Sequence, residues 1–203
     1  MAEFKIINPE GNEIHQPESI KLGTNCEINF QPTPRKMSSQ NNSIILGENL
    51  NLNFFRIIIK GHNNKISIGE NTLFTGTIMV QGSNLNVKIG SSCTINGLFI
   101  TCRDQDVIIG NECLISRDVK IRSSDTHKIF ELHGTEQTNK STDPVVIEDH
   151  VWIGEDVFIG KNSSIANGSI VAARTTVTKK ITTPNCVIAE YNKIIRKEIR
   201  WEK

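Results

Sequence analysis

The chain has 203 residues, with 23 lysines and arginines against 22 aspartates and glutamates, and a formal net charge of +1. This balance excludes the broad basic surface that binds nucleic acids or anionic membranes, and no run of about 18 apolar residues predicts a transmembrane helix. The polar start, MAEFKIINPEGNE, lacks the apolar core of a secretory signal, so we expect a cytoplasmic protein whose five cysteines are reduced thiols, with neither a disulfide framework nor a zinc site.

Residues 1–42 show no regular repeat and contain Pro17, Pro32 and Pro34. The stretch FKIINPEGNEI suits a hairpin, and QPTPRKMSSQNN is typical of a loop. The ends of a repeat structure need a polar cover over their apolar face. We therefore expect residues 1–42 to cap the repeats that begin at residue 43.

Two periods run through residues 43–187. The longer one places four glycines at spacings of 22, 21 and 20 residues: Gly47, Gly69, Gly90 and Gly110. The shorter one places a branched aliphatic residue at every sixth position of VWIGEDVFIGKNSSIANGSIVA: Ile153, Ile159, Ile165 and Val171. In a helix, six residues turn a side chain by about 240° from its predecessor, whereas in a strand an even number keeps both side chains on one face. The pattern therefore predicts strands with regular bends.

Both periods fit a coil of three short strands. Three hexapeptides make about 18 residues, small insertions lengthen the coil, and successive coils stack at a strand spacing of about 4.8 Å. Each coil leaves an apolar face that only its neighbours cover, so the aliphatic columns form the core. Thr72, Cys93 and Cys113 each lie three residues after a repeat glycine, and we expect them to stack in one inward column.

Two segments leave this pattern. Residues 128–144, KIFELHGTEQTNKSTDP, have no six-residue spacing and are rich in polar side chains, which predicts a loop extruded from the solenoid. The repeats resume at Val145. In the tail, residues 188–203, the stretch KIIRKEIRW mixes apolar and cationic residues, which favours a short amphipathic helix that closes the end.

The stretch IEDHVWIGEDVFIGKNSSIANGSIVAARTTVTKKI resembles the bacterial hexapeptide-repeat acyltransferases, and the likeness extends over roughly residues 44–201. SSDTHKIF, followed after the insertion by VVIEDHVWIG, is most similar to the sugar O-acetyltransferases that modify capsule, lipopolysaccharide or polysialic acid. The resemblance implies an all-β fold, a left-handed parallel β-helix with an extruded loop. It also implies a homotrimer with its sites between subunits, acetyl-CoA as co-substrate and no required metal.

His127 is the candidate general base. It stands where the coil register ends and the loop begins, and a neutral imidazole, with a reference pKa of about 6.5, suits proton removal from a hydroxyl near pH 7. By residue type alone, a histidine that fills a turn is the more common case; the resemblance places the catalytic histidine of O-acetyltransferases in this SSDxH setting. Asp125 either orients the imidazole or forms the turn. With Arg103 and Arg122, it is our candidate for binding the sugar acceptor.

Trp152 faces outward by strand alternation, and an exposed tryptophan on a polar wall indicates a ligand, unless it packs under the loop. The resemblance places it beside the acetyl-CoA channel, in a catalytic and a cofactor-binding role. VAARTTVTKKI is similar to the family's Gly-Ala-x-Ser-x-Val-Thr-Lys segment. The resemblance therefore implies a set of CoA contacts: Trp152, Gly154, Glu155, Ala173, Thr178, Lys179 and Arg196.

One departure bears on this set. Relatives carry Gly-Asn-Pro-Ala-Lys before the tail, whereas here residues 189–193 read AEYNK, with Ala189 and Tyr191 in place of glycine and proline. The alternative to CoA binding for the two cations of this set, Lys179 and Arg196, is that they are solvated surface charges.

These assignments predict an acetyl-CoA-dependent O-acetyltransferase that modifies a sugar hydroxyl of a bacterial surface polysaccharide, by direct transfer and without an acyl-enzyme. Alternatives on the same fold are an amino-sugar N-acetyltransferase, an antibiotic acetyltransferase, and a non-catalytic binding or scaffold protein. A metal site like that of the γ-carbonic anhydrases needs three converging histidines, for which His127, His133 and His150 are available.

Overall fold

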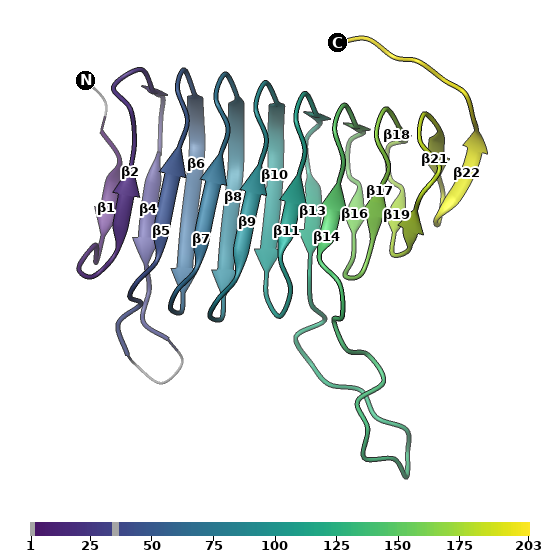
Figure 1. The fold of residues 1–203 in the computed structure, drawn as a ribbon, viewed down its shortest axis with the longest axis horizontal. Helices are drawn as coiled ribbons and strands as arrows, with labels where there is room; N and C mark the ends of the chain where they lie inside the picture. The colour runs from purple at the N-terminus through teal and green to yellow at the C-terminus, as the bar shows by residue number, and fades with distance from the viewer. Residues whose placement is uncertain (1–2, 34–36) are drawn as a thin grey trace.

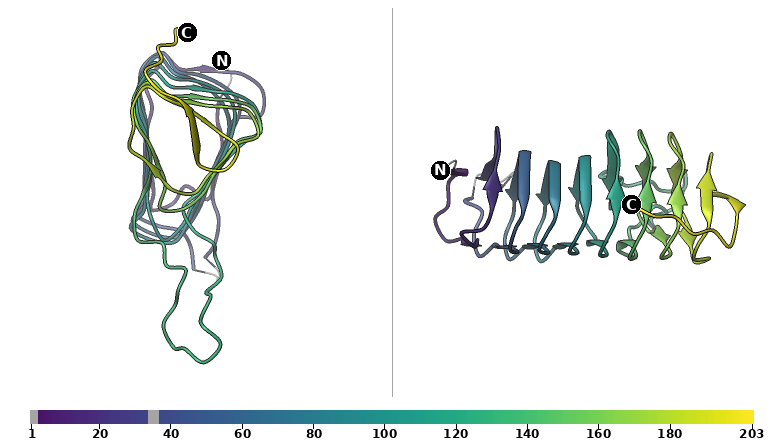
Figure 2. Two further views of the ribbon diagram at one scale, coloured as in Figure 1. Left: turned by 90° about the vertical axis from the view of Figure 1, so that its right-hand side faces the viewer. Right: turned by 90° about the horizontal axis from the view of Figure 1, so that it is seen from above.

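The computed structural model describes residues 3–33 and 37–203, and the regular structure in this part of the chain is entirely β. Short strands wind into a solenoid whose coils lie side by side along the long axis (Figure 1). Viewed down that axis, the coils superpose into one flattened ring (Figure 2, left). The predicted solenoid is confirmed. Among the described residues, no helix is long and apolar enough to cross a membrane.

The strands form two sheets. One sheet contains eight strands: β2 (Glu13–His15), β5 (Ser43–Leu46), β7 (Lys65–Ile68), β9 (Asn86–Ile89), β11 (Val107–Ile109), β14 (Val145–Ile147), β17 (Ser164–Ile165) and β20 (Lys180–Ile181). The other contains fourteen: β1 (Lys5–Ile7), β3 (Lys21–Leu22), β4 (Glu27–Phe30), β6 (Asn51–Lys60), β8 (Leu73–Gln81), β10 (Thr94–Cys102), β12 (Leu114–Ile115), β13 (Val119–Arg122), β15 (Trp152–Ile153), β16 (Phe158–Ile159), β18 (Ile170–Val171), β19 (Thr176–Val177), β21 (Val187–Ala189) and β22 (Lys193–Arg196).

The six-residue period becomes three inward columns. Ile153 pairs with Ile115 of the preceding coil and Val171 of the next, and Ile159 pairs with Ile121 and Val177 in the same way. Ile165 continues a third column in the other sheet. All of these side chains are fully buried. Each such burial contributes roughly 1.5–3 kcal/mol, so the columns are the core of the fold.

The expected column of small residues is confirmed. The amide of Leu73 donates to the carbonyl of Cys93 (3.0 Å) and that of Thr94 to the carbonyl of Cys113 (2.9 Å), so the coils stack in register here. The hydroxyl of Thr72 accepts from the amide of Cys93 (3.1 Å). Thr72, Cys93 and Cys113 are buried, and the thiols pack as small apolar side chains.

The solenoid begins earlier than the expected boundary at residue 43. β1 pairs in parallel with β4, β4 with β6 and β2 with β5, so this segment joins the ladder. The suggested hairpin does not form, since β1 and β2 lie in different sheets. Phe4 supplies core here, and its ring packs edge-on against Phe55, with centroids 6.3 Å apart. Of the expected loop at residues 31–42, positions 34–36 lie outside the described residues.

The extruded loop is present between β13 and β14. Residues 123–144 leave the solenoid at one corner and project well beyond the ring (Figures 1 and 2). An isolated bridge between Phe130 and Gln137 joins the two arms of the loop. Its apolar side chains are exposed, most of all Leu132 at 90%.

The predicted tail helix over residues 188–203 is wrong. The chain turns after β21 and returns as β22, antiparallel to it, and then runs back across earlier coils, where Lys203 Nζ donates to the carbonyl of Ser92 (2.5 Å; Figure 1). Glu190, Asn192 and Glu198 have left-handed φ values of 58°, 55° and 58°, which interrupt any helix. The Ile-Ile pair of KIIR is β-branched and takes a strand edge instead.

Candidate active site

His127 stands at the root of the extruded loop, where two serines attach it to the preceding coil. Ser123 Oγ donates to the carbonyl of Arg103 (2.8 Å) and accepts from its amide (2.9 Å). Ser124 Oγ donates to a carboxylate oxygen of Asp104 and accepts from the amide of Thr126 (2.9 Å). Both serines are buried, so the backbone leading to His127 is fixed on the solenoid.

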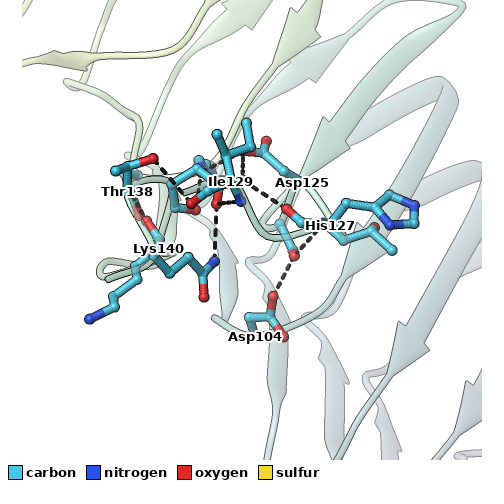
Figure 3. Close-up of polar contacts among 12 residues, drawn as sticks. Asp104, Asp125, His127, Ile129, Thr138 and Lys140 are labelled. Carbon is cyan, nitrogen blue, oxygen red and sulfur yellow. Dashed lines mark hydrogen bonds and ion pairs between the residues drawn. The ribbon is translucent and has the colours of Figure 1, made fainter. Parts of the chain in front are cut away.

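Asn139 closes the base of the loop from its returning arm. Its Nδ2 donates to the carbonyl of His127 (2.8 Å) and to Asp125 Oδ2 (3.0 Å), and its Oδ1 accepts from the amide of Ile129 (2.8 Å; Figure 3). From the next coil, Lys161 Nζ lies 2.5 Å from Asp125 Oδ2 and donates to the carbonyl of Asn139 (2.5 Å). Both arms of the loop are therefore tied to each other and to the coil that follows.

The imidazole of His127 is exposed, and no described residue forms a hydrogen bond with it. In Figure 3 its ring points away from the group of dashed contacts. Asp125, which we considered as its orienting group, instead directs its carboxylate to Lys161 and Asn139. Partial burial raises the pKa of Asp125, but hydrogen bonds from these two residues and the charges of Lys161 and Arg122 outweigh it and hold the pKa below its usual value. Asp125 thus acts as a loop anchor here.

A pocket of about 290 Å³ opens at this root. His127 lines it together with polar and charged groups, among them Arg103, Asp104, Lys128, Asn139 and Lys140. A second pocket of about 310 Å³ lies across the root, where Arg122, Lys161 and Thr178 meet Asp125. The structure therefore gathers the three expected acceptor residues, Arg103, Arg122 and Asp125, around the loop root.

Trp152 lies elsewhere in the same chain. Trp152 begins β15, the strand after β14, and His127 lies in the loop before β14. The two side chains therefore lie at opposite ends of the coil side that β14 forms. Trp152 faces outward, as expected, and its exposed fraction is 38%. It packs against Trp201 of the tail, with ring centroids 6.0 Å apart, and not under the loop. A single chain does not bring His127 and Trp152 together.

The expected CoA contacts divide between two corners. Gly154, Glu155 and Ala173 lie at the turns that follow β15 and β18, and the backbone of Gly154 passes so close to Ala173 that a Cβ there would lie 2.7 Å from its nitrogen. Thr178 and Lys179 follow β19, at the solenoid corner from which the extruded loop leaves.

The AEYNK segment, residues 189–193, which departs from the family sequence, supplies contacts at this second corner. Thr178 Oγ1 donates to Tyr191 Oη (2.9 Å), and its amide donates to Asn192 Oδ1 (2.7 Å). Arg196 ends β22 and is exposed.

Sequence reasoning missed Ser124, Asn139 and Lys161, because their roles depend on partners 10 to 36 residues away that no local motif marks; Lys161 in particular contacts Asp125 across a coil. Within the described ranges, no group of three histidine, cysteine or acidic side chains is placed to hold a metal ion. His150 stacks on Trp201.

Two curated relatives match the chain. A polysialic acid O-acetyltransferase of Neisseria meningitidis is 32% identical over 139 residues, which are 65% of this chain and 64% of that protein. A polysialic acid O-acetyltransferase of Escherichia coli O1:K1 / APEC is 37% identical over 140 residues, which are 68% of this chain and 45% of that protein. The chain thus matches less than two thirds of the length of either relative. No family model matches it.

Two solved structures share the whole architecture. The polySia-specific acetyltransferase NeuO superposes with a TM-score of 0.82 at 29% identity, over 99% of this chain and 88% of that one. The polysialic acid O-acetyltransferase OatWY superposes with a TM-score of 0.85 at 27% identity, over 98% and 90%. By its repeat and its solenoid, the chain has the left-handed parallel β-helix fold of the hexapeptide-repeat acyltransferases, and its homologues are polysialic acid O-acetyltransferases.

Proposed function

We propose that this chain is an acetyl-CoA-dependent O-acetyltransferase that esterifies a hydroxyl of an acidic bacterial capsular polysaccharide, of the polysialic acid type. The observation that carries the proposal is the exposed imidazole of His127, held by its backbone at the loop root and lining a polar pocket with Arg103. The relatives named as polysialic acid O-acetyltransferases support the acceptor class. We also propose that the enzyme works in the cytoplasm, where acetyl-CoA is made.

In this proposal His127 takes the proton of the sugar hydroxyl while the hydroxyl oxygen attacks the thioester carbonyl. The tetrahedral intermediate then collapses, and the imidazolium gives the proton to the departing CoA thiolate. Acetyl-CoA supplies the activated acetyl group when bound. Direct transfer forms no acyl-enzyme, and the burial of all five cysteines agrees with this. A positioned base of this kind accelerates a reaction by about 10²- to 10⁴-fold.

We propose that the complete site forms between two subunits of a homotrimer. His127 and Trp152 sit at opposite ends of one coil side, so a site that uses both needs a second chain. The exposed apolar side chains of the loop, Phe130 and Leu132, support a contact with that chain. The CoA contacts would then come from both corners: Trp152, Gly154, Glu155 and Ala173 at one, and Thr178 and Lys179 at the other, with Arg196 near the phosphates.

The acceptor would lie on the loop side of the site. Arg103 and Arg122 flank the loop root, and guanidinium groups bind carboxylates through paired hydrogen bonds. An acidic sugar next to His127 therefore finds cations on both sides.

The direct test is His127→Ala, assayed by CoA release with polysialic acid and acetyl-CoA. We expect a loss of at least about 10²-fold in kcat. The control is His133→Ala, a histidine farther out on the same loop, which should keep full activity. Transfer that persists within a few-fold in His127→Ala, or an equal loss in both variants, would refute the role of His127.

The alternatives give different results. An O-acetyl ester is removed by mild alkali, whereas the amide made by an amino-sugar N-acetyltransferase survives it. A non-catalytic β-helix would not be stabilised by acetyl-CoA in a thermal melt. Stoichiometric zinc in the purified protein, lost together with activity on chelation, would favour the metal-site alternative.

A further inference from the structure

The end of the chain lies along the solenoid corner that precedes β15, where Trp152 stands. After β22 it runs back over earlier coils (Figure 1), and we call residues 197–203 the tail strap. Its three anchors are hydrogen bonds from Ile199 N to the carbonyl of Asn185 (2.9 Å), from Trp201 Nε1 to that of His150 (3.2 Å) and from Lys203 Nζ to that of Ser92 (2.5 Å). The three acceptor residues have left-handed φ values of 52°, 54° and 57°, so each occupies a turn of its coil.

Trp201 is the side chain of the tail strap that the solenoid holds most firmly. It is 8% exposed, and its indole stacks on the imidazole of His150 with centroids 4.0 Å apart. His150 Nε2 donates to the carbonyl of Trp201 (3.2 Å), so the backbone of Trp201 is fixed as well as its ring. Trp201 therefore forms a rigid wall at this corner.

Trp152, in contrast, receives little support from its own strand, since β15 is two residues long. Its amide donates to the carbonyl of Ser169 (2.9 Å), and it pairs with Leu114 of the preceding coil and Ile170 of the next. These backbone contacts fix the direction of the Cα–Cβ bond, but the rotation of the indole about χ1 and χ2 depends on what the ring itself touches. The indole is 38% exposed, so the coil wall covers only part of it.

Trp201 supplies a contact to the ring of Trp152 itself. The two indoles lie with centroids 6.0 Å apart and planes inclined by 48°, within the range of distances that aromatic pairs prefer. A half-exposed ring that rests on a buried one loses rotational freedom before any ligand arrives, which lowers the entropic cost of binding. The tail strap therefore determines how the indole of Trp152 is presented at the surface.

We propose that Trp201 is a positioning residue, which holds the indole of Trp152 in the orientation that receives acetyl-CoA. The inference rests on the proposed function and deepens it, because the tail of the subunit that supplies Trp152 then becomes part of the site between two subunits. Without the Trp201 ring, Trp152 keeps its place on β15 but its indole turns more freely. A displacement of about 1 Å at a reacting group can lower a rate by up to about 10²-fold.

The kinetic test compares Trp201→Ala and Trp201→Phe with the control Arg200→Ala, which truncates an exposed neighbour on the tail strap that pairs with Glu202. We expect Trp201→Ala to lower kcat/KM for acetyl-CoA roughly tenfold or more and to change KM for the glycan acceptor by less than about twofold. Trp201→Phe, which keeps an aromatic ring, should restore most of the loss, and Arg200→Ala should behave as the wild type. An unchanged kcat/KM in Trp201→Ala, or an equal loss in Arg200→Ala, would overturn the role.

A double-variant cycle separates positioning from a general loss of stability. In a Trp152→Ala background there is no indole left for Trp201 to hold. Trp201→Ala should then lower the urea midpoint as before but cause no further loss of activity. If the loss of activity in this background is as large as in the wild type, Trp201 acts through stability or assembly, and the positioning role is wrong.

A binding measurement distinguishes this inference from the proposed chemistry. Acetyl-CoA is titrated calorimetrically onto His127→Ala protein with and without Trp201→Ala. Binding that Trp201→Ala weakens roughly fivefold or more supports the positioning role even if no glycan is acetylated, a result that would count against the proposed function alone. Equal affinity together with equal kcat/KM overturns the positioning role and leaves the proposed function standing, whereas no binding to either protein overturns both.

Discussion

The indole of Trp201 lies flat on the imidazole of His150, with ring centroids 4.0 Å apart and planes inclined by 6°. Trp201 Nε1 donates to the carbonyl of His150 (3.2 Å), and His150 Nε2 donates to the carbonyl of Trp201 (3.2 Å). These contacts join residues 51 positions apart. They fix the tail to the corner before β15 and set one face of Trp152 against Trp201.

We expect Trp201→Ala to release this tail. The side chain is 8% exposed, and its removal should lower the free energy of unfolding by roughly 1–3 kcal/mol, less than for a full core tryptophan because the tail can move. Urea unfolding measures this loss, and the fluorescence of Trp152 should show that its indole is more exposed to solvent. Trp201→Phe keeps the stack and should retain most of the stability; an unchanged urea midpoint in Trp201→Ala would show that the tail contributes nothing.

Two repeat glycines should respond differently to alanine. A Cβ on Gly154 would lie 2.7 Å from the backbone nitrogen of Ala173, whereas one on Gly160 would first meet the movable Cγ2 of Thr178 at 3.1 Å. We expect Gly154→Ala to destabilise the protein by about 1–3 kcal/mol and Gly160→Ala by clearly less, as measured by thermal or urea unfolding. Similar midpoints for the two variants would contradict this difference.

Acid should loosen the loop root through Asp125. Its pKa is lowered in the folded protein, so the carboxylate stabilises the fold above its unfolded pKa of about 3.9, and this stabilisation is lost as the pH falls through the lower folded value. At pH 6 we expect Asp125→Asn to melt at a lower temperature than the wild type. The loss in free energy of unfolding should be less than about 1 kcal/mol, because the Asp125 side chain is half exposed. The difference should begin to shrink near pH 4 and vanish once the pH is below the lowered pKa of Asp125 in the folded protein. A difference that is constant with pH would assign the effect to packing.

Lys161→Met is the matched variant for the other side of this ion pair. It removes the ammonium that contacts Asp125 and the carbonyl of Asn139 but keeps the aliphatic stem. We expect it to reproduce the loss seen in Asp125→Asn at pH 6, and the double variant to add little more. Full additivity would show that the two residues act independently.

The cysteines should be inert in the folded protein. All five are buried, and burial together with the nearby charge of Asp106 raises the pKa of Cys102 to about 12. At pH 7.5 we expect iodoacetamide to label less than one thiol per chain without a change in activity, and all of them in denaturant. Rapid native labelling that stops acetyl transfer would reopen the question of an acyl-cysteine.

The tail and the N-terminal segment depart from their predicted structures for the same physical reason: pairing with distant strands decides both. The mixture of apolar and cationic residues in KIIRKEIRW suits either a helix or a strand edge, and only pairing with β21 makes the choice. Residues 5–30 carry too few repeats to be recognised, yet they pair with later coils as well as the regular segments do. Strand alternation predicts the outward position of Trp152, but it does not predict the contact with Trp201.

The sequence by itself determined the solenoid, its buried aliphatic columns and the exit of a loop beside His127, because side-chain direction in a strand depends only on position along the chain, and a period of six repeats that direction. Tertiary structure alone decided which residues hold the loop root and where the tail runs. Contacts such as Lys161 with Asp125, or Trp201 with His150, follow from which coils stack and how far side chains reach across them, and no local pattern records that.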